Sequence, residues 1–189
     1  MRVVLLLLAM LLPGLPAAAQ EPFPPVDEAS RQPDFQAWRQ ELEGVVAARD
    51  ARALLPFLDE GIVYSFGRAR PGRQGFAEFW TLDAPSSPLW AELDTVLRRG
   101  GGFGDDGTFH APYAVSEWPA DKDSLEWGAL VGPVAIHAAP SASSQVLYEM
   151  RNVLVRRGPL GRVTAGGQDW VNVLLPPDVQ NARKVESGF

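Results

Sequence analysis

The chain has 189 residues, 46% of them hydrophobic and 21% charged, which is typical of a globular protein with room for one medium core or two small ones. Its formal net charge of −6 repels nucleic-acid phosphates and anionic membrane surfaces, so we expect no nucleic-acid partner. It contains no cysteine, which excludes a disulfide, a thiol nucleophile and a lipid-modified cysteine.

Residues 1–20, MRVVLLLLAMLLPGLPAAAQ, place one arginine before an apolar run that ends in Pro-Gly-Leu-Pro and three alanines. This order is typical of a secretory signal peptide, with cleavage near Ala19. The apolar run from Val3 to Leu12 is shorter than the ~20 residues that span a membrane, although a retained anchor is the alternative. We therefore expect an exported protein, periplasmic or extracellular, that is not stably inserted in a membrane after cleavage.

Residues 21–33 contain four prolines and little apolar periodicity, which predicts an extended linker. Regular structure is expected to begin at Asp34, as the N-cap of a helix. The segment FQAWRQELEGVVAARD then repeats apolar residues at spacings of three and four, which predicts one apolar face along that helix.

Further elements follow in the same half of the chain. Asp50 is expected to cap a second short helix, ARALLPFLDE, and the segment IVYSF after it is strand-like. GRARPGRQG reads as a polar connection. Ser87 and Pro88 predict the start of a third helix that ends near Arg99. A turn cluster and a short strand in TFHAPYAV complete a compact α+β arrangement.

The pattern changes near residue 124. No helical stripe appears after this point, and short apolar segments recur between Gly, Pro or Ser: ALV, VAI, VLYEM, VLVRR, GRVTA and WVNVLL. Five or six short strands predict a small barrel or roll. The expected fold class is α+β, with an α+β domain at 34–123 followed by a β-barrel domain at 124–189.

Alternation of period two in VAIH and DWVNV predicts an inner and an outer face on each of these strands. Four apolar side chains are expected to bury together: Val134, Ile136, Val171 and Val173. The outer faces then carry His137, Trp170 and Asn172.

The order of VAIHAAPSASSQVLYEM, VLVRR and WVNVLLP carries a family resemblance. Residues 128–180 resemble the bacterial SH3-like domain, in which a Val-x-Val-Arg strand precedes a Pro-Ser loop, two strands and a Trp-x-x-Val strand. The whole layout is similar to that of secreted bacterial proteins with such a domain at the C-terminus. The resemblance implies a partly open barrel without catalytic chemistry, which binds cell-wall peptide, glycan or a protein partner.

Two features depart from that family pattern. His137 stands where the family usually has arginine, and no closing Gly-Tyr-Val strand appears in PPDVQNARKVESGF. We expect either that DVQ or RKVES supplies the last strand, or that the barrel stays short and the N-terminal domain covers its exposed edge.

Trp170, Tyr148 and His137 are the candidate ligand-binding residues. Their rings are expected to line a groove on which a sugar or peptide stacks. The alternative for Trp170 is a rim position covered by the neighbouring domain. The other tryptophans are expected to pack in the core (Trp38, Trp80, Trp90) or to join the two domains (Trp118, Trp127).

No catalytic constellation stands out, so a binding protein is expected in preference to an enzyme. The two histidines, His110 and His137, fall in different domains, which disfavours a two-histidine metal site. Asp105 and Asp106 lack the spaced oxygen ligands of a calcium-binding loop. We expect no catalytic residue, no metal and no cofactor.

Two weaker interpretations stay open. The polar connection contains three arginines, which either keep a loop surface solvated or bind an anion: Arg68, Arg70 and Arg73. A glycosidase-like pair of carboxylates, such as Glu41 with Glu78 or Glu117, also stays open, because the distance between two carboxylates cannot be read from a sequence.

The sequence therefore favours an exported, non-enzymatic binding or scaffold protein whose SH3-like domain recognises a cell-envelope component. That component is a peptidoglycan peptide, a glycan or a protein. One alternative places a small-ligand or hydrolytic site in the N-terminal domain, with the cone-shaped nuclear-transport-factor-like fold, although four further strands are hard to find before residue 124. The other alternative is a purely structural protein-interaction module.

Overall fold

The computed structural model describes residues 20–64 and 71–189, and it mixes helix and strand as the α+β prediction requires. The helices are α1 (Pro33–Ala48), α2 (Ala51–Leu54), α3 (Arg73–Phe79), α4 (Leu89–Arg98), α5 (Tyr113–Ser116) and α6 (Pro177–Arg183), with 3₁₀ turns η1 (Ala29–Arg31) and η2 (Leu55–Phe57). The strands are β1 (Gln20–Pro22), β2 (Gly102–Phe103), β3 (Phe109–His110), β4 (Trp127–His137), β5 (Val146–Ala165), β6 (Gln168–Leu174) and β7 (Ser187–Gly188). The expected signal peptide lies outside the described residues, apart from Gln20.

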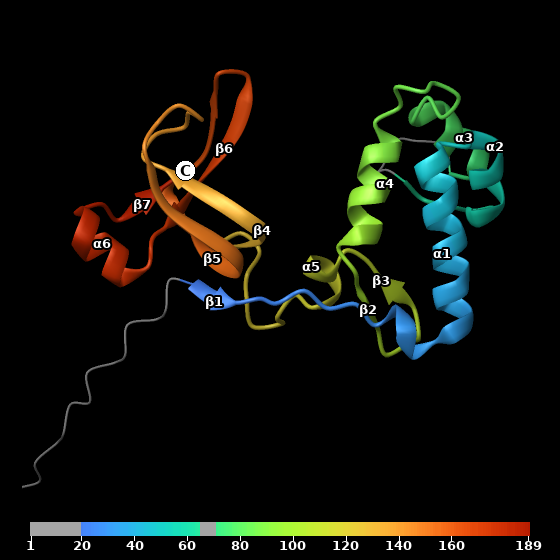
Figure 1. Ribbon diagram of the computed structural model, residues 1–189, viewed down its shortest axis with the longest axis horizontal. Helices are drawn as coiled ribbons and strands as arrows, with labels where there is room; N and C mark the ends of the chain where they lie inside the picture. Colours follow the sequence, from blue (N-terminus) through green and yellow to red (C-terminus); the bar gives the residue numbers. More distant parts are fainter. Residues whose placement is uncertain (1–19, 65–70) are drawn as a thin grey trace, which may run out of the picture.

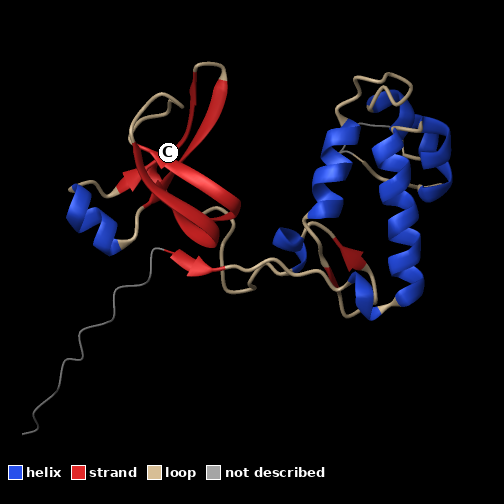
Figure 2. Ribbon diagram, in the orientation of Figure 1, coloured by secondary structure: helices blue, strands red, loops and turns tan. Residues whose placement is uncertain are grey.

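Most of the helices and most of the strands gather in two separate halves (Figures 1 and 2). We call residues 33–116 the helical half. Residues 127–189, together with β1, form the β half. The only described strands of the helical half are the two-residue β2 and β3, which pair antiparallel.

The helical half has its own core of five buried apolar side chains: Leu54, Phe76, Leu82, Leu89 and Trp90. Local signals predicted its main helices. Asp50 accepts hydrogen bonds from the backbone N–H groups of Arg52 and Ala53, both at 3.0 Å, which confirms the cap of α2. The backbone N–H of Leu89, the first residue of α4, donates to Ser87 Oγ at 3.3 Å, although the N-cap of α4 is Pro88.

Four expectations for the helical half are wrong. Asp34 is not an N-cap, because α1 begins at Pro33 and its N-cap is Gln32. Residues 62–64 of IVYSF form no strand, while the last two residues of that segment lie outside the described residues. The polar connection contains the start of α3, whose Phe76 anchors it in the core. Trp38 is not a core residue, because 42% of its surface is exposed. The described residues of this half therefore supply no curved sheet of the nuclear-transport-factor-like kind.

The β half is built around the long strand β5. Residues 146–156 of β5 pair with β4, and residues 157–165 pair with β6. The register shifts between Arg157 and Arg162, where Gly158-Pro-Leu-Gly161 lets the strand bend. The expected five or six short strands are thus fewer and longer, because VLYEM, VLVRR and GRVTA belong to one strand.

The four side chains predicted to bury together do so. Ile136 and Val173 are buried in one apolar core of the β half, and Val134 and Val171 pack against it. Asn172, by contrast, was expected outside and has no exposed surface. It is buried because β7 and the bend of β5 cover the other face of β6, where its side chain donates to Gly188 O at 2.9 Å.

The end of the chain returns to the start of the β half. β7 pairs with β6, so the segment after RKVE supplies the last strand, whereas DVQ lies in helix α6. The backbone groups of His137 and Phe189 exchange two hydrogen bonds, at 2.5 and 2.8 Å. No closed barrel is detected among the described strands.

The prediction that residues 21–33 form only an extended linker is wrong. β1 pairs antiparallel with residues 153–155 of β5, and Phe23 is buried. Residues 27–31 then contact the helical half, so this segment joins the two halves along one side (Figure 1). The proline-rich composition suggested a linker, but proline is compatible with this strand. Pro22 lies on an edge strand, where its missing N–H does not remove a hydrogen bond between strands.

A third apolar cluster lies where the halves meet. It contains four buried side chains, one each from the residue after β1, from α5, from β4 and from β5: Phe23, Tyr113, Trp127 and Leu154. Tyr113 Oη donates to the backbone oxygen of Phe23 at 3.2 Å, and burial raises the pKa of Tyr113. Trp118 packs against this cluster, which confirms the prediction that Trp118 and Trp127 join the two parts of the chain.

Candidate ligand pocket in the β half

A pocket of about 390 Å³ opens in the β half, a volume in the range of small-ligand sites. Its floor consists of core side chains, among them Ile136, Val155 and Val173, and is apolar. Its rim is formed by Trp170, Phe189 and neighbouring residues of β4. The pocket therefore reaches the core between strands that do not close completely.

Two charged side chains line the mouth of the pocket, Arg157 and Asp169. Asp169 accepts a hydrogen bond from Thr164 Oγ1 at 2.7 Å and pairs with Arg162 at 3.6 Å. Arg157 donates through Nε to the backbone oxygen of Trp127 at 3.3 Å and forms no ion pair with any described residue. Its terminal nitrogen atoms are consequently available to an anionic group.

The predicted site residues are brought together only in part. The rings of His137 and Trp170 meet edge to face with centroids 5.7 Å apart, and Trp170 lines the pocket. His137 Nδ1 lies 3.1 Å from the backbone oxygen of Ser144; since a carbonyl only accepts, Nδ1 carries a hydrogen. Tyr148 instead packs against the core of the β half and does not line the pocket.

Two buried groups fix the bend of β5 beside the pocket. Asn172 Oδ1 accepts from the backbone N–H of Leu160 at 3.3 Å, while its amide nitrogen holds β7. A side chain at Gly158 would overlap the Asn172 carboxamide, so only glycine fits there. The bend turns Arg157 and β6 toward the same opening.

The sequence did not single out Arg157, Asp169 or Phe189. The first two lie within predicted strand segments, Arg157 as the last residue of VLVRR and Asp169 as the first residue of DWVNV. A charge at the end of an apolar strand is a weak signal, because it usually marks a solvated strand end. The convergence of these residues depends on the bend of β5.

The other chemical candidates gain no support from the geometry. Among residues 20–64 and 71–189, no group of three or more His, Asp or Glu side chains is arranged to hold a metal. Arg68 and Arg70 lie outside the described residues, and Arg73 donates to Leu58 O at 2.7 Å. Glu78 accepts from Gln74 and Glu117 from Ser116, so each has a local structural partner.

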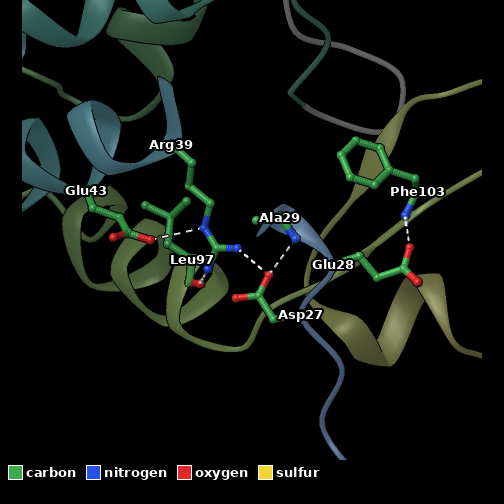
Figure 3. A network of polar contacts seen from close by, with 7 residues as sticks. All are labelled: Asp27, Glu28, Ala29, Arg39, Glu43, Leu97 and Phe103. Atoms are coloured by element: carbon green, nitrogen blue, oxygen red, sulfur yellow. Dashed lines mark hydrogen bonds and ion pairs between the residues drawn. The ribbon is translucent and has the colours of Figure 1, made fainter. Parts of the chain in front are cut away.

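A polar network missed by the sequence reasoning joins residues 27–31 to the helical half (Figure 3). Arg39 is buried and donates to Asp27 Oδ1 at 2.7 Å, to Glu43 Oε1 at 3.0 Å and to the backbone oxygen of Leu97. Glu28 accepts from the backbone N–H of Phe103 at 3.1 Å, and this hydrogen bond lowers the pKa of Glu28. Each of the three guanidinium nitrogen atoms of Arg39 has an acceptor from the protein itself, so we interpret the network as structural.

Comparison of the chain with protein-family models, curated proteins and solved structures finds no match. No helix in the described part of the chain has both the length and the apolar character needed to cross a membrane.

Proposed function

We propose that this is an exported, non-enzymatic binding protein whose β half is a partly open, SH3-like barrel that recognises a cell-envelope ligand. The supporting observation is the pocket of about 390 Å³ with an apolar floor and Trp170 on its rim. Apolar walls with a few convergent polar groups are the usual composition of a ligand site. The apolar leader in residues 1–20 supports export.

The charges at the mouth favour a peptide over a neutral glycan. Arg157 has no acidic partner among the described residues, whereas Asp169 is shared with Arg162 and Thr164. A short peptide would place an aliphatic side chain on the valine-rich floor and a carboxylate beside Arg157. Stem peptides of peptidoglycan have this combination of small side chains and free carboxylates.

Co-sedimentation of the exported protein with purified peptidoglycan tests the proposal. We expect the wild-type protein to pellet with the polymer, and Trp170→Ala to weaken binding about tenfold because an aromatic side chain of the pocket rim is removed. Val146→Ala is the matched control, since Val146 is an exposed β5 side chain outside the pocket. It should bind within about twofold of wild type.

Arg157→Gln distinguishes a peptide from a glycan in the same assay. If a carboxylate contacts Arg157, this variant should also lose most of its binding, and the loss should shrink at high salt. Absence of sedimentation by wild type, or equal binding by wild type and Trp170→Ala, would overturn the proposed function.

A further inference from the structure

Five aromatic side chains form a continuous row on the surface of the helical half. We call this row the aromatic shelf: Phe35, Trp38, Phe57, Phe103 and Phe109. Neighbouring ring centroids are 4.6 to 5.6 Å apart. Four of the rings belong to none of the three apolar cores, and Trp38 keeps 42% of its surface exposed. The other four rings are partly buried, so the row is exposed mainly at Trp38. An exposed tryptophan beside further partly exposed rings is typical of an interaction surface.

Acidic residues lie on the same elements as the rings of the aromatic shelf. Asp34 and Glu41 lie on α1 at positions i−4 and i+3 from Trp38, so both are its neighbours on the helix surface. Both are exposed and have no hydrogen bond or ion pair with a described residue. Asp105 and Asp106 lie in the turn between β2 and β3, and residues 102–110 contain no lysine or arginine.

The one basic residue of α1 does not neutralise this surface. The Arg39 side chain is directed inward, where Asp27 and Glu43 take its hydrogen bonds. Its guanidinium lies 5.9 Å from the centroid of the Phe109 ring. On the inner side of the aromatic shelf, Arg39 therefore lies beside an aromatic ring and two carboxylates. On the outer side, Trp38 lies beside the carboxylates of Asp34 and Glu41, and α1 supplies no arginine there.

We infer that the aromatic shelf docks a basic peptide segment of another protein, with arginine side chains spaced by apolar residues. A planar guanidinium stacks on Trp38 and meets Asp34 or Glu41, and apolar side chains cover the neighbouring rings. Charge complementarity selects this occupant over an anionic membrane, which the acidic rim repels. The inference does not depend on the ligand of the β half.

The test uses a synthetic twelve-residue peptide of alternating Arg and Leu, titrated by calorimetry into the protein at about 50 and 500 mM salt. Trp38→Ala should weaken binding about tenfold or more, since the central exposed ring is lost. The double variant Asp34→Asn, Glu41→Gln should weaken it about fivefold at low salt and much less at high salt.

Matched control variants show whether peptide binding depends on the aromatic shelf itself or on any exposed ring and any acidic charge of the protein. Phe79→Ala removes another exposed aromatic ring of the helical half, and Glu60→Gln with Asp83→Asn removes the same amount of charge elsewhere. Both should bind within about twofold of wild type. Equal weakening by these controls, or no binding of the peptide by wild type, would overturn the inference.

A final arm tests a carbohydrate as the occupant. The probe is a tetramer of N-acetylglucosamine, which has no cation. If this tetramer binds more tightly than the peptide, and if Trp38→Ala abolishes that binding while the double variant leaves it unchanged, the aromatic shelf is a sugar platform and the inference is wrong. Preference for the peptide supports it.

Discussion

Arg39 shows how one side chain holds the helical half to the segment that enters it. It is the only buried charged residue among those that the structure describes, and its three hydrogen bonds reach a carboxylate before α1, a carboxylate on α1 and the last turn of α4. Burying a guanidinium is costly unless its donors are satisfied. Here all three contacting nitrogen atoms have oxygen partners (Figure 3).

Arg39→Met should lower the free energy of unfolding by about 2 kcal/mol, measured by urea denaturation at neutral pH. The loss is moderate because Asp27 and Glu43 are half exposed and regain water. Arg98→Met is the matched control, since its pair with Asp94 is solvated, and it should change stability by less than about 0.5 kcal/mol. Equal effects of the two substitutions would show that the buried network adds nothing.

At the scale of elements, strand β1 and the loop before β4 form a second connection between the halves. Lys122 pairs with Glu21 of β1 at 2.9 Å, and its ammonium lies 4.6 Å from the centroid of the Trp127 ring. The hydrogen bond to the Glu21 carboxylate raises the pKa of Lys122, because it favours the charged ammonium.

A raised lysine pKa in the folded state contributes stability that is present below the unfolded-state pKa, about 10.4. It is lost as the pH rises through the folded-state pKa. We therefore expect Lys122→Gln to be less stable than wild type at neutral pH, and the difference to disappear in strongly alkaline solution. Thermal melts from pH 7 to 11 would measure it, and a difference that is constant across this range would contradict the assigned pair.

The elements that sequence reasoning found are those with local signals. α1 and α4 show apolar residues at helical spacing, Asp50 is a cap, and the β4 and β6 segments alternate. α3 and α6 are seven residues long, too short for a clear stripe, and depend on tertiary packing. β1 is three residues long and its partner β5 lies near the other end of the chain, so no local pattern encodes it.

The candidate pocket was likewise predicted only where its residues have local sequence signals. His137 and Trp170 were predicted from alternation along two strands, and their rings do meet. Tyr148 was predicted to join them only because its side chain is aromatic, but the register of β5 turns it toward the core. Arg157 and Asp169 line the same pocket only because β5 bends between residues 157 and 162, a feature that needs the buried Asn172 and Gly158.

At the scale of the whole molecule, two cores are joined by a third cluster and by residues 20–31. The pocket lies in the β half and the aromatic shelf in the helical half. The two surfaces differ in chemistry, since one offers an arginine beside an apolar hollow and the other offers carboxylates beside the exposed Trp38 and four partly buried rings. In the functions that we propose, the β half holds an envelope ligand and the helical half holds a basic partner.

The most direct test of the pocket is an NMR titration of ¹⁵N-labelled protein with a disaccharide-tetrapeptide fragment of peptidoglycan. We expect amide shift changes to gather at Asp169, Trp170 and Val171, to include the Trp170 indole N–H, and to vanish in Trp170→Ala. Shift changes centred on the helical half, or none at millimolar fragment, would contradict the account.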